Sequence, residues 1–582
     1  MGRFPALRTA RTVLAFALLA ALGAALAAFA GRPARRRADF AFTSGGEARS
    51  LDPHAASGVP EGRVVRLLFE GLVSRSPRNL SFEPAAAKSW EISDDRLTYV
   101  FELRDDGRWS NGEPVLAEDF VWSFRRLLDR ETGSDYASAL WCVEGAEEFT
   151  TGADPDWSRV GIRALGERTL ELRLASPTPY LLDLLAHHVF APVHRASLES
   201  LRAEHPSTWS VEWTRPENLV CNGPFRLVER RVAERLRFER NESYWDASHV
   251  AMRTVDVLTV ENWNTALNLY LTGDLDWLDG TVPSHQVPSL AKREDFHAFG
   301  YLGIYFYRVN VTKPPFNDKR VRQALTYAIR RGDLCNNVLK SGQRPAFTFA
   351  PGGYVGAYKS PNGFGESDVL ARTLLAEAGF DGSSPEKQFP TIEIHFNTGE
   401  SHRDVAEVIS EQWREALGIR TRLRNQEWKS FLDAQSRLDY EISRSSWIAD
   451  YPDPSTFFDI WTTGHENNRT GWSHPGYDDL VRRAKSERDT TRRLQLYQNA
   501  ERVLLSELPC IPIYSYVSQS VLDPRAGGFG SNVLDLQSPK HWYWRDDAEL
   551  QKSRAEAKSK AARVSSHGPR EGLYAREREE AR

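Results

Sequence analysis

Polar and apolar residues alternate most regularly between residues 391 and 446, where two patterns take turns. Stretches of strict alternation are typical of strands, and apolar residues three or four apart are typical of helices. The patterns predict strands at 391–396, 419–424 and 440–446, with helices at 401–417 and 427–435 between them. Because a helix connects each strand to the next, the three strands should be parallel and joined by right-handed crossovers.

The expected helix at 401–417 has a signal at each end. Ser401 followed by Asp404 is a capping pattern for the first turn, and Gly418 is a common terminator. The apolar positions between these signals recur at helical spacing, at Val405, Ile409, Trp413 and Leu417.

Ligands of open α/β sheets bind outside the carboxyl ends of the strands. In this unit the rule indicates two places, the helix start around His402 and the segment 444–450. Both belong to the same edge of the predicted sheet, so we expect a crevice there.

The first segment of the chain is a targeting signal. Arg3, Arg8 and Arg11 precede an apolar run over 13–30, which ends in a small-x-small site at 28–30. The run is also near the lower length limit for spanning a membrane, and the basic stretch 32–37 follows it. Residues 1–38 are therefore either a cleaved signal peptide or a retained signal anchor, and in both cases the body of the protein is exported.

Composition narrows the class of protein. The 582 residues allow more than one domain, and 41% hydrophobic with 26% charged residues is ordinary for a soluble globular protein. A net charge of −4 gives no indication of nucleic-acid binding. Residues 548–582 are mostly Lys, Arg, Glu, Ala and Ser, which predicts a charged, disordered tail.

The four cysteines leave two alternatives open. None lies in or just after the leader, which excludes an amino-terminal lipid anchor on cysteine. Export permits disulfides, but the spacing dictates no pairing, and buried thiols explain the residues equally well. The four are Cys142, Cys221, Cys335 and Cys510.

Three residues at the predicted sheet edge suit a zwitterionic ligand such as a peptide. A buried ammonium group needs a fixed carboxylate, which Asp450 can provide. Arg444 can fork onto a carboxylate, and Trp447 can form a wall of the site. From spacing alone, Asp450 could equally be a turn residue and Arg444 a solvated strand residue.

The run Trp447–Pro454, which reads W-I-A-D-Y-P-D-P, resembles a segment of the oligopeptide-binding proteins of ABC importers, solute-binding family 5. Further segments resemble the same family in the same order and cover nearly all of residues 40–545. They are 50–54, 58–61, 68–72, 109–115, 119–121, 136–138, 222–225, 313–318 and 425–429.

The resemblance implies an α/β fold of the two-lobed periplasmic-binding-protein type, class II, with an additional third domain. The segments it implies are lobe I at 39–75, 200–304 and 515–547, the extra domain at 76–199, and the peptide-anchoring lobe II at 305–514.

It also implies roles for individual residues. Asp450 matches the partner of the peptide's amino terminus, and Arg444, His402 and Lys340 match positions that receive its carboxylate at different peptide lengths. His402 stands at the predicted start of a helix, where the dipole favours an anion. The residues implied to line the cleft are Tyr136, Trp447 and Tyr514.

Three departures from the family pattern put the preferred length and charge of the peptide in doubt. Ser57 stands where well-studied members carry a glutamate, and Gln435 stands where an arginine is expected. Ile448 replaces a cysteine found beside the tryptophan in some members, which removes one disulfide.

The resemblance implies a receptor and not an enzyme. The implied receptor is a monomer, which binds an oligopeptide without a cofactor or metal and delivers the peptide to an inner-membrane ABC permease. No hydrolase motif such as G-x-S-x-G or H-E-x-x-H occurs. The same family also includes receptors for dipeptides, nickel chelates, haem, opines and oligosaccharides. A receptor without a transport role, tethered by a retained leader, is a third alternative.

Overall fold

The computed structural model describes residues 37–555 except for residues 44, 49, 57, 281, 352–357 and 400, and it leaves the side chain of Lys429 undescribed. The chain divides into two compact units, Met1–Asp39 and Phe40–Arg582, and the description below concerns the second. Apart from residues 37 and 38, the predicted leader lies outside the described residues, and so does Ser57. Residues 547–555 are helical, and the rest of the predicted tail also lies outside.

An 11-stranded mixed sheet organises the second unit. Its strands follow the order β15-β14-β16-β12-β17-β11-β1-β10-β9-β8, and β13 pairs with β17 off this path. The bounds, in the order of the sheet, are β15 Thr421–Gln426, β14 Ile392–Asn397, β16 Ile442–Ile448, β12 Phe296–Val309, β17 Cys510–Leu522, β11 Trp277–Asp279, β1 Phe40–Thr43, β10 Thr254–Leu258, β9 Arg235–Arg240, β8 Phe225–Arg231 and β13 Arg344–Pro345.

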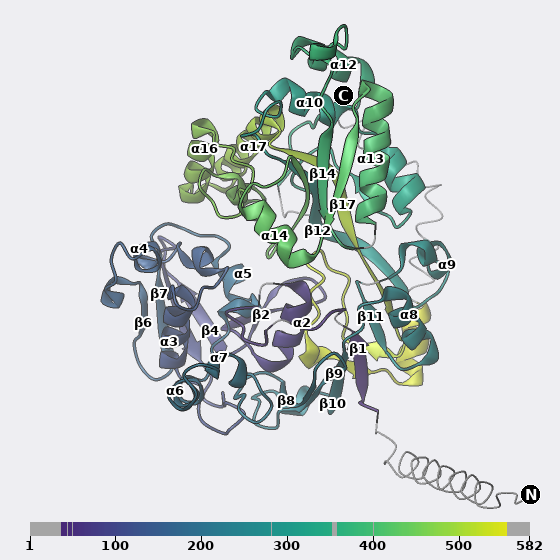
Figure 1. Ribbon diagram of the computed structural model, residues 1–582. Coiled ribbons are helices and arrows are strands. Elements are labelled where there is room, and N and C mark those ends of the chain that lie inside the picture. The colour runs from purple at the N-terminus through teal and green to yellow at the C-terminus, as the bar shows by residue number, and fades with distance from the viewer. Residues whose placement is uncertain are drawn as a thin grey trace, which may run out of the picture. The chain divides into compact units, whose positions relative to one another are not determined.

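Strands β12 and β17 are the longest and connect the two ends of this sheet. They pair antiparallel, and Figure 1 shows them running from the part that holds β14 toward the part that holds β11. Their register shifts between Gly300 and Ile304, which leaves residues 301–303 as a bulge in β12. Within the bulge, Leu302 donates its N–H to Val533 at 2.7 Å and accepts the N–H of Ala449 at 2.8 Å. The bulge thereby fixes the chain immediately after β16.

Alternate residues of β12 belong to two different hydrophobic cores. Tyr305 and Tyr307 pack in one buried cluster, and Ile304 and Phe306 pack in another. Side chains of a strand alternate between the faces of its sheet, so this part of the sheet is covered on both faces. The helices over the two faces are α10 Lys319–Tyr327, α12 Asp368–Glu377 and α13 His402–Leu417 for the first cluster, and α15 Ser455–Phe458, α16 Pro475–Ser486 and α17 Thr490–Glu507 for the second.

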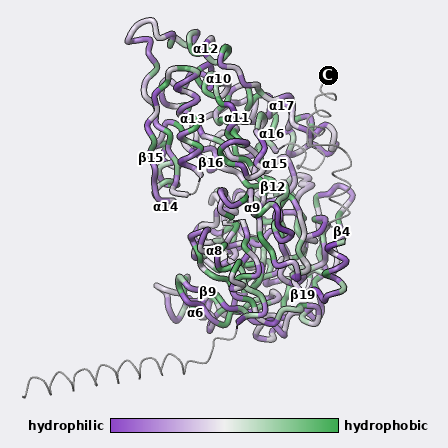
Figure 2. Tube along the Cα trace, turned by 90° about the vertical axis from the view of Figure 1, so that its right-hand side faces the viewer, coloured by the Kyte–Doolittle hydropathy of each residue, from purple (hydrophilic) through white to green (hydrophobic). Residues whose placement is uncertain are grey.

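The predicted β-α-β-α-β unit is confirmed. Strands β14, β15 and β16 are parallel, with α13 and α14 (Trp428–Ser436) between them in sequence. Observed boundaries differ from the predicted ones by at most two residues. The edge strand β15 is polar, as the purple stretch from β15 to α14 in Figure 2 shows, and two of its arginines bond to Glu393 at 2.8 and 3.0 Å.

The ends of α13 match the prediction at one side only. Gly418 ends the helix with φ at 70°, and its N–H bonds to Arg414 at 3.0 Å. Ser401, however, has φ at 67° and makes no side-chain capping bond, so the predicted capping pattern is wrong. A capping side chain requires an extended backbone to reach the first free N–H groups, and Ser401 is in the left-handed region instead.

A second sheet of four antiparallel strands lies within the predicted extra domain. Its order is β4-β5-β7-β6, and α3 packs against it through Phe120, Phe124 and Leu127. The strands and the helix are β4 Ala87–Ile92, β5 Thr98–Leu103, β7 Thr169–Arg173, β6 Ile162–Ala164 and α3 Ala117–Leu128. The predicted domain boundaries remain predictions, and the boundary after residue 75 falls between β2 (Val73–Arg75) and β3 (Phe82–Pro84), which pair with each other.

No two of the four cysteines, all of which lie in the described part of the chain, form a disulfide. Cys221, Cys335 and Cys510 are buried and Cys142 is partly buried. Burial raises the pKa of Cys142 to about 11 and that of Cys221 to about 12. Of the two alternatives, the structure therefore supports buried thiols.

Gly223 fixes the distance between β8 and the end of helix α2 (Val59–Leu68). Its N–H bonds to Leu68 C=O at 2.8 Å, and a Cβ at this position would lie 2.5 Å from the carbonyl carbon of Leu68. Because backbone atoms cannot give way locally, Gly223→Ala should lower the free energy of unfolding by about 1–3 kcal/mol. Urea unfolding measures this change. The control is Gly166→Ala, where no atom lies within 4 Å of the added Cβ, and equal stabilities of the two variants would contradict the expectation.

Candidate functional site

Asp450 lies just past the end of β16, and its side chain is 24% exposed. The hydroxyl of Tyr136 donates a hydrogen bond to Oδ1 of Asp450 at 3.1 Å, and Nε2 of His187 lies 3.6 Å from the same oxygen. Among the described residues, no Lys or Arg nitrogen lies within 4.0 Å of this carboxylate. Asp450 is therefore a partly buried acid that has polar neighbours but no cationic partner in contact.

The environment of Asp450 sets its charge near neutral pH. Burial raises the pKa of the carboxyl to about 6, against the hydrogen bond from Tyr136 and the charge of Arg66, which both lower it. At pH 7 the group is mostly ionised, but a partner cation would stabilise it further.

The neighbours of Asp450 form a stack of rings. Tyr136 lies on His187 with ring centroids 5.1 Å apart, and His187 contacts His188 at 4.2 Å. Burial, together with the charge of Arg66, lowers the pKa of His187 to about 3, so this ring is neutral at pH 7. Tyr136 and His187 therefore lie against Asp450 without supplying a positive charge.

Contacts between aromatic and polar side chains hold the segment after Asp450 against the 76–199 segment. Tyr451 stacks on Tyr180 at 4.9 Å and 3° between the planes, and Ser138 donates to Glu466 at 3.4 Å. Arg493 lies 5.7 Å from the Tyr180 ring and pairs with Asp453. The candidate site is thus built by residues that are far apart in the sequence.

Arg444 lies within β16 and is only 8% exposed. Its Nη1 donates to Asn397 Oδ1 at 3.3 Å and its Nη2 to the Tyr516 hydroxyl at 3.1 Å, while Cζ lies 5.0 Å from the Tyr305 ring. Its Nε is buried without a hydrogen-bond partner. No carboxylate of the described chain lies within 4.0 Å, so this buried cation also has no ionic partner.

His402 and Tyr514 lie beside Arg444. Tyr514 is 3% exposed and stacks on Tyr305 at 4.6 Å, and Nδ1 of His402 lies 3.4 Å from the Tyr305 hydroxyl. Burial, together with the charge of Arg444, lowers the pKa of His402 to about 2. The imidazole is therefore neutral and can serve an anion as a hydrogen-bond donor but not as a charge.

The remaining two predicted residues lie apart from these groups. Lys340 is exposed, in a left-handed conformation after the helical turn Leu334–Leu339, where its backbone N–H donates to Cys335 C=O at 2.9 Å. Its side chain makes no hydrogen bond or salt bridge with a described residue. Trp447 donates its indole N–H to Thr456 at 3.1 Å and packs against the cluster on the opposite face of the sheet from Arg444. The structure thus groups Asp450 with Tyr136, and Arg444 with His402 and Tyr514.

Two of the departures from the family pattern support the strand that carries the site. Gln435 is buried and donates to Ser443 Oγ at 2.9 Å and to the backbone C=O of Arg444 at 2.8 Å. A Cβ on Gly303 would lie 2.4 Å from Cδ1 of Ile448, so the bulge and the end of β16 are in close contact.

Two residues near Asp450, His187 and Arg66, were not predicted from the sequence. Both act on Asp450, but they come from segments more than two hundred residues away along the chain. His187 stands in an ordinary apolar stretch and Arg66 is one of many helix arginines, so no local pattern identified either.

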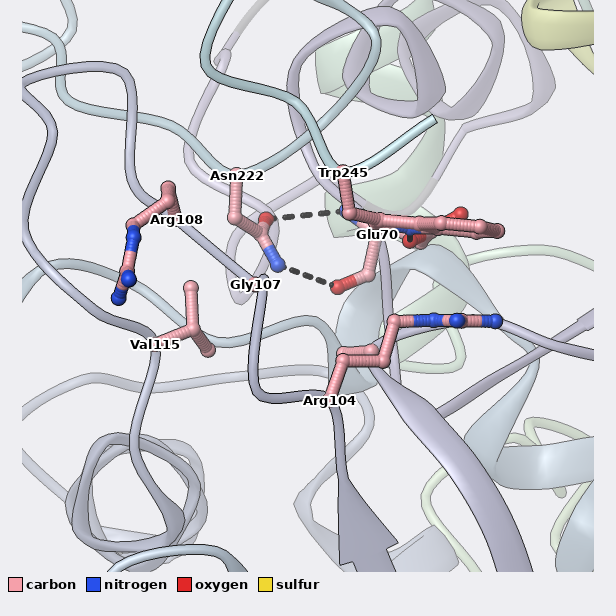
Figure 3. Close-up of a pocket in the computed structure, with 8 residues that line it drawn as sticks. Glu70, Arg104, Gly107, Arg108, Val115, Asn222 and Trp245 are labelled. Carbon is pink, nitrogen blue, oxygen red and sulfur yellow. Dashed lines mark hydrogen bonds between the residues drawn. The ribbon is translucent and has the colours of Figure 1, made fainter. Parts of the chain in front are cut away.

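Two cavities lie away from the predicted residues. Figure 3 shows the smaller, about 10 Å³, where the backbone N–H and C=O of Glu70 both bond to the side-chain amide of Asn222. The Glu70 carboxylate accepts the Trp245 indole N–H at 2.7 Å. This volume holds about one water molecule. The larger, about 520 Å³, lies between Arg293–Asp295, Asp523–Arg525 and the helix at 547–555.

Two other kinds of site are absent from the described residues. No cluster of three His, Cys, Asp or Glu side chains could hold a metal ion. No helix is long and apolar enough to span a membrane.

Solved structures of bacterial binding proteins have the same fold. One, described as the Escherichia coli murein tripeptide binding protein MppA, is 32% identical with a TM-score of 0.80, over 88% of this chain and 99% of that one. Another, Haemophilus influenzae OppA in complex with RPPGFSPFR, is 30% identical with a TM-score of 0.79 over the same shares.

Sequence comparison leads to the same group of proteins. The periplasmic oligopeptide-binding protein OppA of Escherichia coli K12 is 34% identical over 550 residues, which is 92% of this chain and 98% of that protein. The family whose model matches residues 81–469 is described as bacterial extracellular solute-binding proteins, family 5. The chain belongs to this family of extracellular solute-binding proteins.

Proposed function

We propose that the chain is an extracytoplasmic receptor that binds oligopeptides and delivers them to an ABC importer. The observation that carries this function is a pair of opposite charges, Asp450 and Arg444, at one edge of the sheet. Each is largely buried, and neither has an ionic partner in the described part of the chain. A peptide supplies both missing partners in one molecule, an ammonium at one end and a carboxylate at the other.

The energetic argument rests on the cost of burying single charges. An ion in a dry site costs several kcal/mol unless an opposite charge is placed in contact with it. The carboxylate of Asp450 receives the peptide ammonium beside the Tyr136 hydroxyl, and the fork of Arg444 receives the peptide carboxylate. The neutral His402 adds a hydrogen-bond donor next to Arg444.

The spacing of the two charges sets a length for the ligand. Asp450 follows Arg444 by six positions, and because β16 ends at Ile448, a rise of ~3.3 Å per residue gives an upper limit of about 20 Å for the span. An extended peptide covers the same span with about five or six residues. Shorter or longer peptides place their carboxylate nearer to other donors, and Lys340 and His402 are the candidates.

Recognition of the peptide backbone explains how one site serves many sequences. An extended ligand that pairs with strand edges bonds through groups common to all peptides, and water fills the space around its side chains. The relative crystallised in complex with the nine-residue peptide RPPGFSPFR supports a peptide as the class of ligand.

The family consists of receptors for solutes, and we extend this to the present chain, which acts without chemical change of its ligand. The relatives are called periplasmic, which agrees with export by the leader. Binding of the peptide between the 76–199 segment and the strand that carries Asp450 gives the permease a closed form to recognise.

Replacing the anchoring carboxylate tests the function directly. Asp450→Asn should weaken the binding of a free pentapeptide by at least about 100-fold, because the buried ammonium loses its counter-charge. Isothermal calorimetry measures this, with Asp439→Asn as the control, since that carboxylate is 61% exposed. Undiminished binding by the Asp450 variant would contradict the assignment.

The pKa of Asp450 predicts a pH dependence of affinity. The ammonium binds the ionised carboxylate, so affinity should be constant above pH 6 and should fall about tenfold per pH unit below it, as protons compete for the group. Calorimetry of one peptide from pH 4.5 to 7.5 gives the profile. Asp450→Asn should flatten it, and an unchanged fall in this variant would assign the titration to another group.

Amidated peptides test the carboxylate end. A free carboxylate should favour binding of a pentapeptide about 10- to 100-fold over its C-terminal amide, because Arg444 has no other ionic partner in the described chain. In Arg444→Gln the two peptides should bind alike. If the variant still distinguishes them, Arg444 does not receive the peptide carboxylate.

A further inference from the structure

Helix α2 brings two arginines to the site. Gly62 lets it lie close to His188, because a Cβ there would be 2.6 Å from Cε1 of that ring. Arg66 is four residues further on and therefore on the same face of the helix, toward His187 and His188. This geometry places Arg66 at the amino end of the proposed peptide site. Burial is the main cause of the low pKa of both histidines, and the charge of Arg66 lowers it further and also acts on Asp450.

Arg66 has no partner in contact. Its side chain makes no hydrogen bond with a described residue, and no described carboxylate lies within 4.0 Å of its guanidinium. Burial, together with the like charge of Arg63, lowers its pKa to about 10, so it remains a cation at neutral pH. The charge of Asp450 reaches it only through space.

Arg63, one turn earlier on α2, shows what a satisfied arginine looks like in this region. Its guanidinium pairs with Asp535 at 2.8 Å and also with Asp279, whose side chain is fully buried. Both carboxylates face Arg63 and neither contacts Arg66. Two carboxylates therefore pair with Arg63, whereas no described carboxylate contacts its neighbour Arg66.

The net charge around the peptide ammonium indicates which further group the bound ligand should carry. Among the groups that act directly on Asp450, Tyr136 and the neutral His187 contribute no charge, so Asp450 and Arg66 together sum to zero. The ligand ammonium adds one positive charge, which leaves two cations around one carboxylate. A second negative charge, supplied by the ligand next to its ammonium, would restore the balance.

We propose that Arg66 is a second anchor, which receives a carboxylate carried by the first or second residue of the bound peptide. The receptor then prefers peptides with an acidic amino-terminal region over neutral ones of the same length. This preference rests on the proposed function, because it requires that Asp450 holds the ammonium close to Arg66.

A purely structural role makes a different prediction. Arg66 lies in the last turn of α2, where a cation stabilises the helix dipole by about 0.3–1 kcal/mol. That role affects the stability of the protein equally with every ligand. Only an anchor makes the effect of the substitution depend on the charge of the peptide.

Calorimetry with two matched peptides separates the roles. For Ala-Glu-Ala-Ala-Ala against Ala-Gln-Ala-Ala-Ala, the native protein should favour the acidic peptide about tenfold at low salt. Arg66→Gln should bind both alike, Arg66→Lys should retain part of the preference, and Arg215→Gln, at an exposed position, should retain all of it. The same ratio of affinities in the native protein and in Arg66→Gln would overturn the proposal.

A scan on the native protein keeps the test independent of how the variants fold. Moving the Glu from the second to the fourth position should abolish the preference, because the carboxylate is then about 7 Å further along an extended chain. A preference that persists at the fourth position would overturn the role of Arg66. Equal binding of all peptides would refute this inference alone, whereas no binding of any peptide would also refute the proposed function.

Discussion

The pairing of β12 with β17 is the constraint on which the rest of the protein depends. These two strands carry the sheet from the β14–β16 side to the β8–β11 side, and the bulge at 301–303 interrupts their register at the point between them. The bulge also bonds to Ala449, so the chain leaves β16 in one defined direction. Asp450 is the next residue, and its position beside Tyr136 follows from this geometry.

Two buried, unpaired charges of opposite sign lie on the strand that forms the site and just after it. Many buried ions elsewhere are matched, as in Arg63 with Asp279 and Asp535, or Arg126 with Asp52 at 2.5 Å. Buried cations without an ionic partner, such as Arg308 and Arg331, donate to backbone carbonyl groups instead. Asp450, Arg444 and Arg66 have polar or aromatic neighbours but no opposite charge in contact among the described residues. Because such an arrangement reduces stability, its persistence at one edge of a sheet is best explained by a ligand that completes it.

Local features of this site were predictable from the sequence, and long-range ones were not. Alternation and helical spacing identified the β-α-β-α-β unit and hence the sheet edge where Arg444 and His402 meet, since these signals depend only on neighbouring residues. The hydrogen bond from Tyr136 to Asp450 joins positions 314 residues apart. The place of Asp450 after the last predicted strand suggested that residue, whereas only the family resemblance suggested Tyr136. Ser401 shows the limit of local patterns, because the turn before α13 imposes a left-handed backbone that the capping pattern cannot reveal.

Capture of peptides with a free amino terminus is the central claim. Native mass spectrometry of the purified protein, mixed with a library of tri- to octapeptides and the same library acetylated at its amino termini, measures this capture in one experiment. The account predicts mass shifts that correspond to the unmodified peptides, with those of about five or six residues most abundant. Equal capture of the acetylated library, or no capture of either, would contradict it.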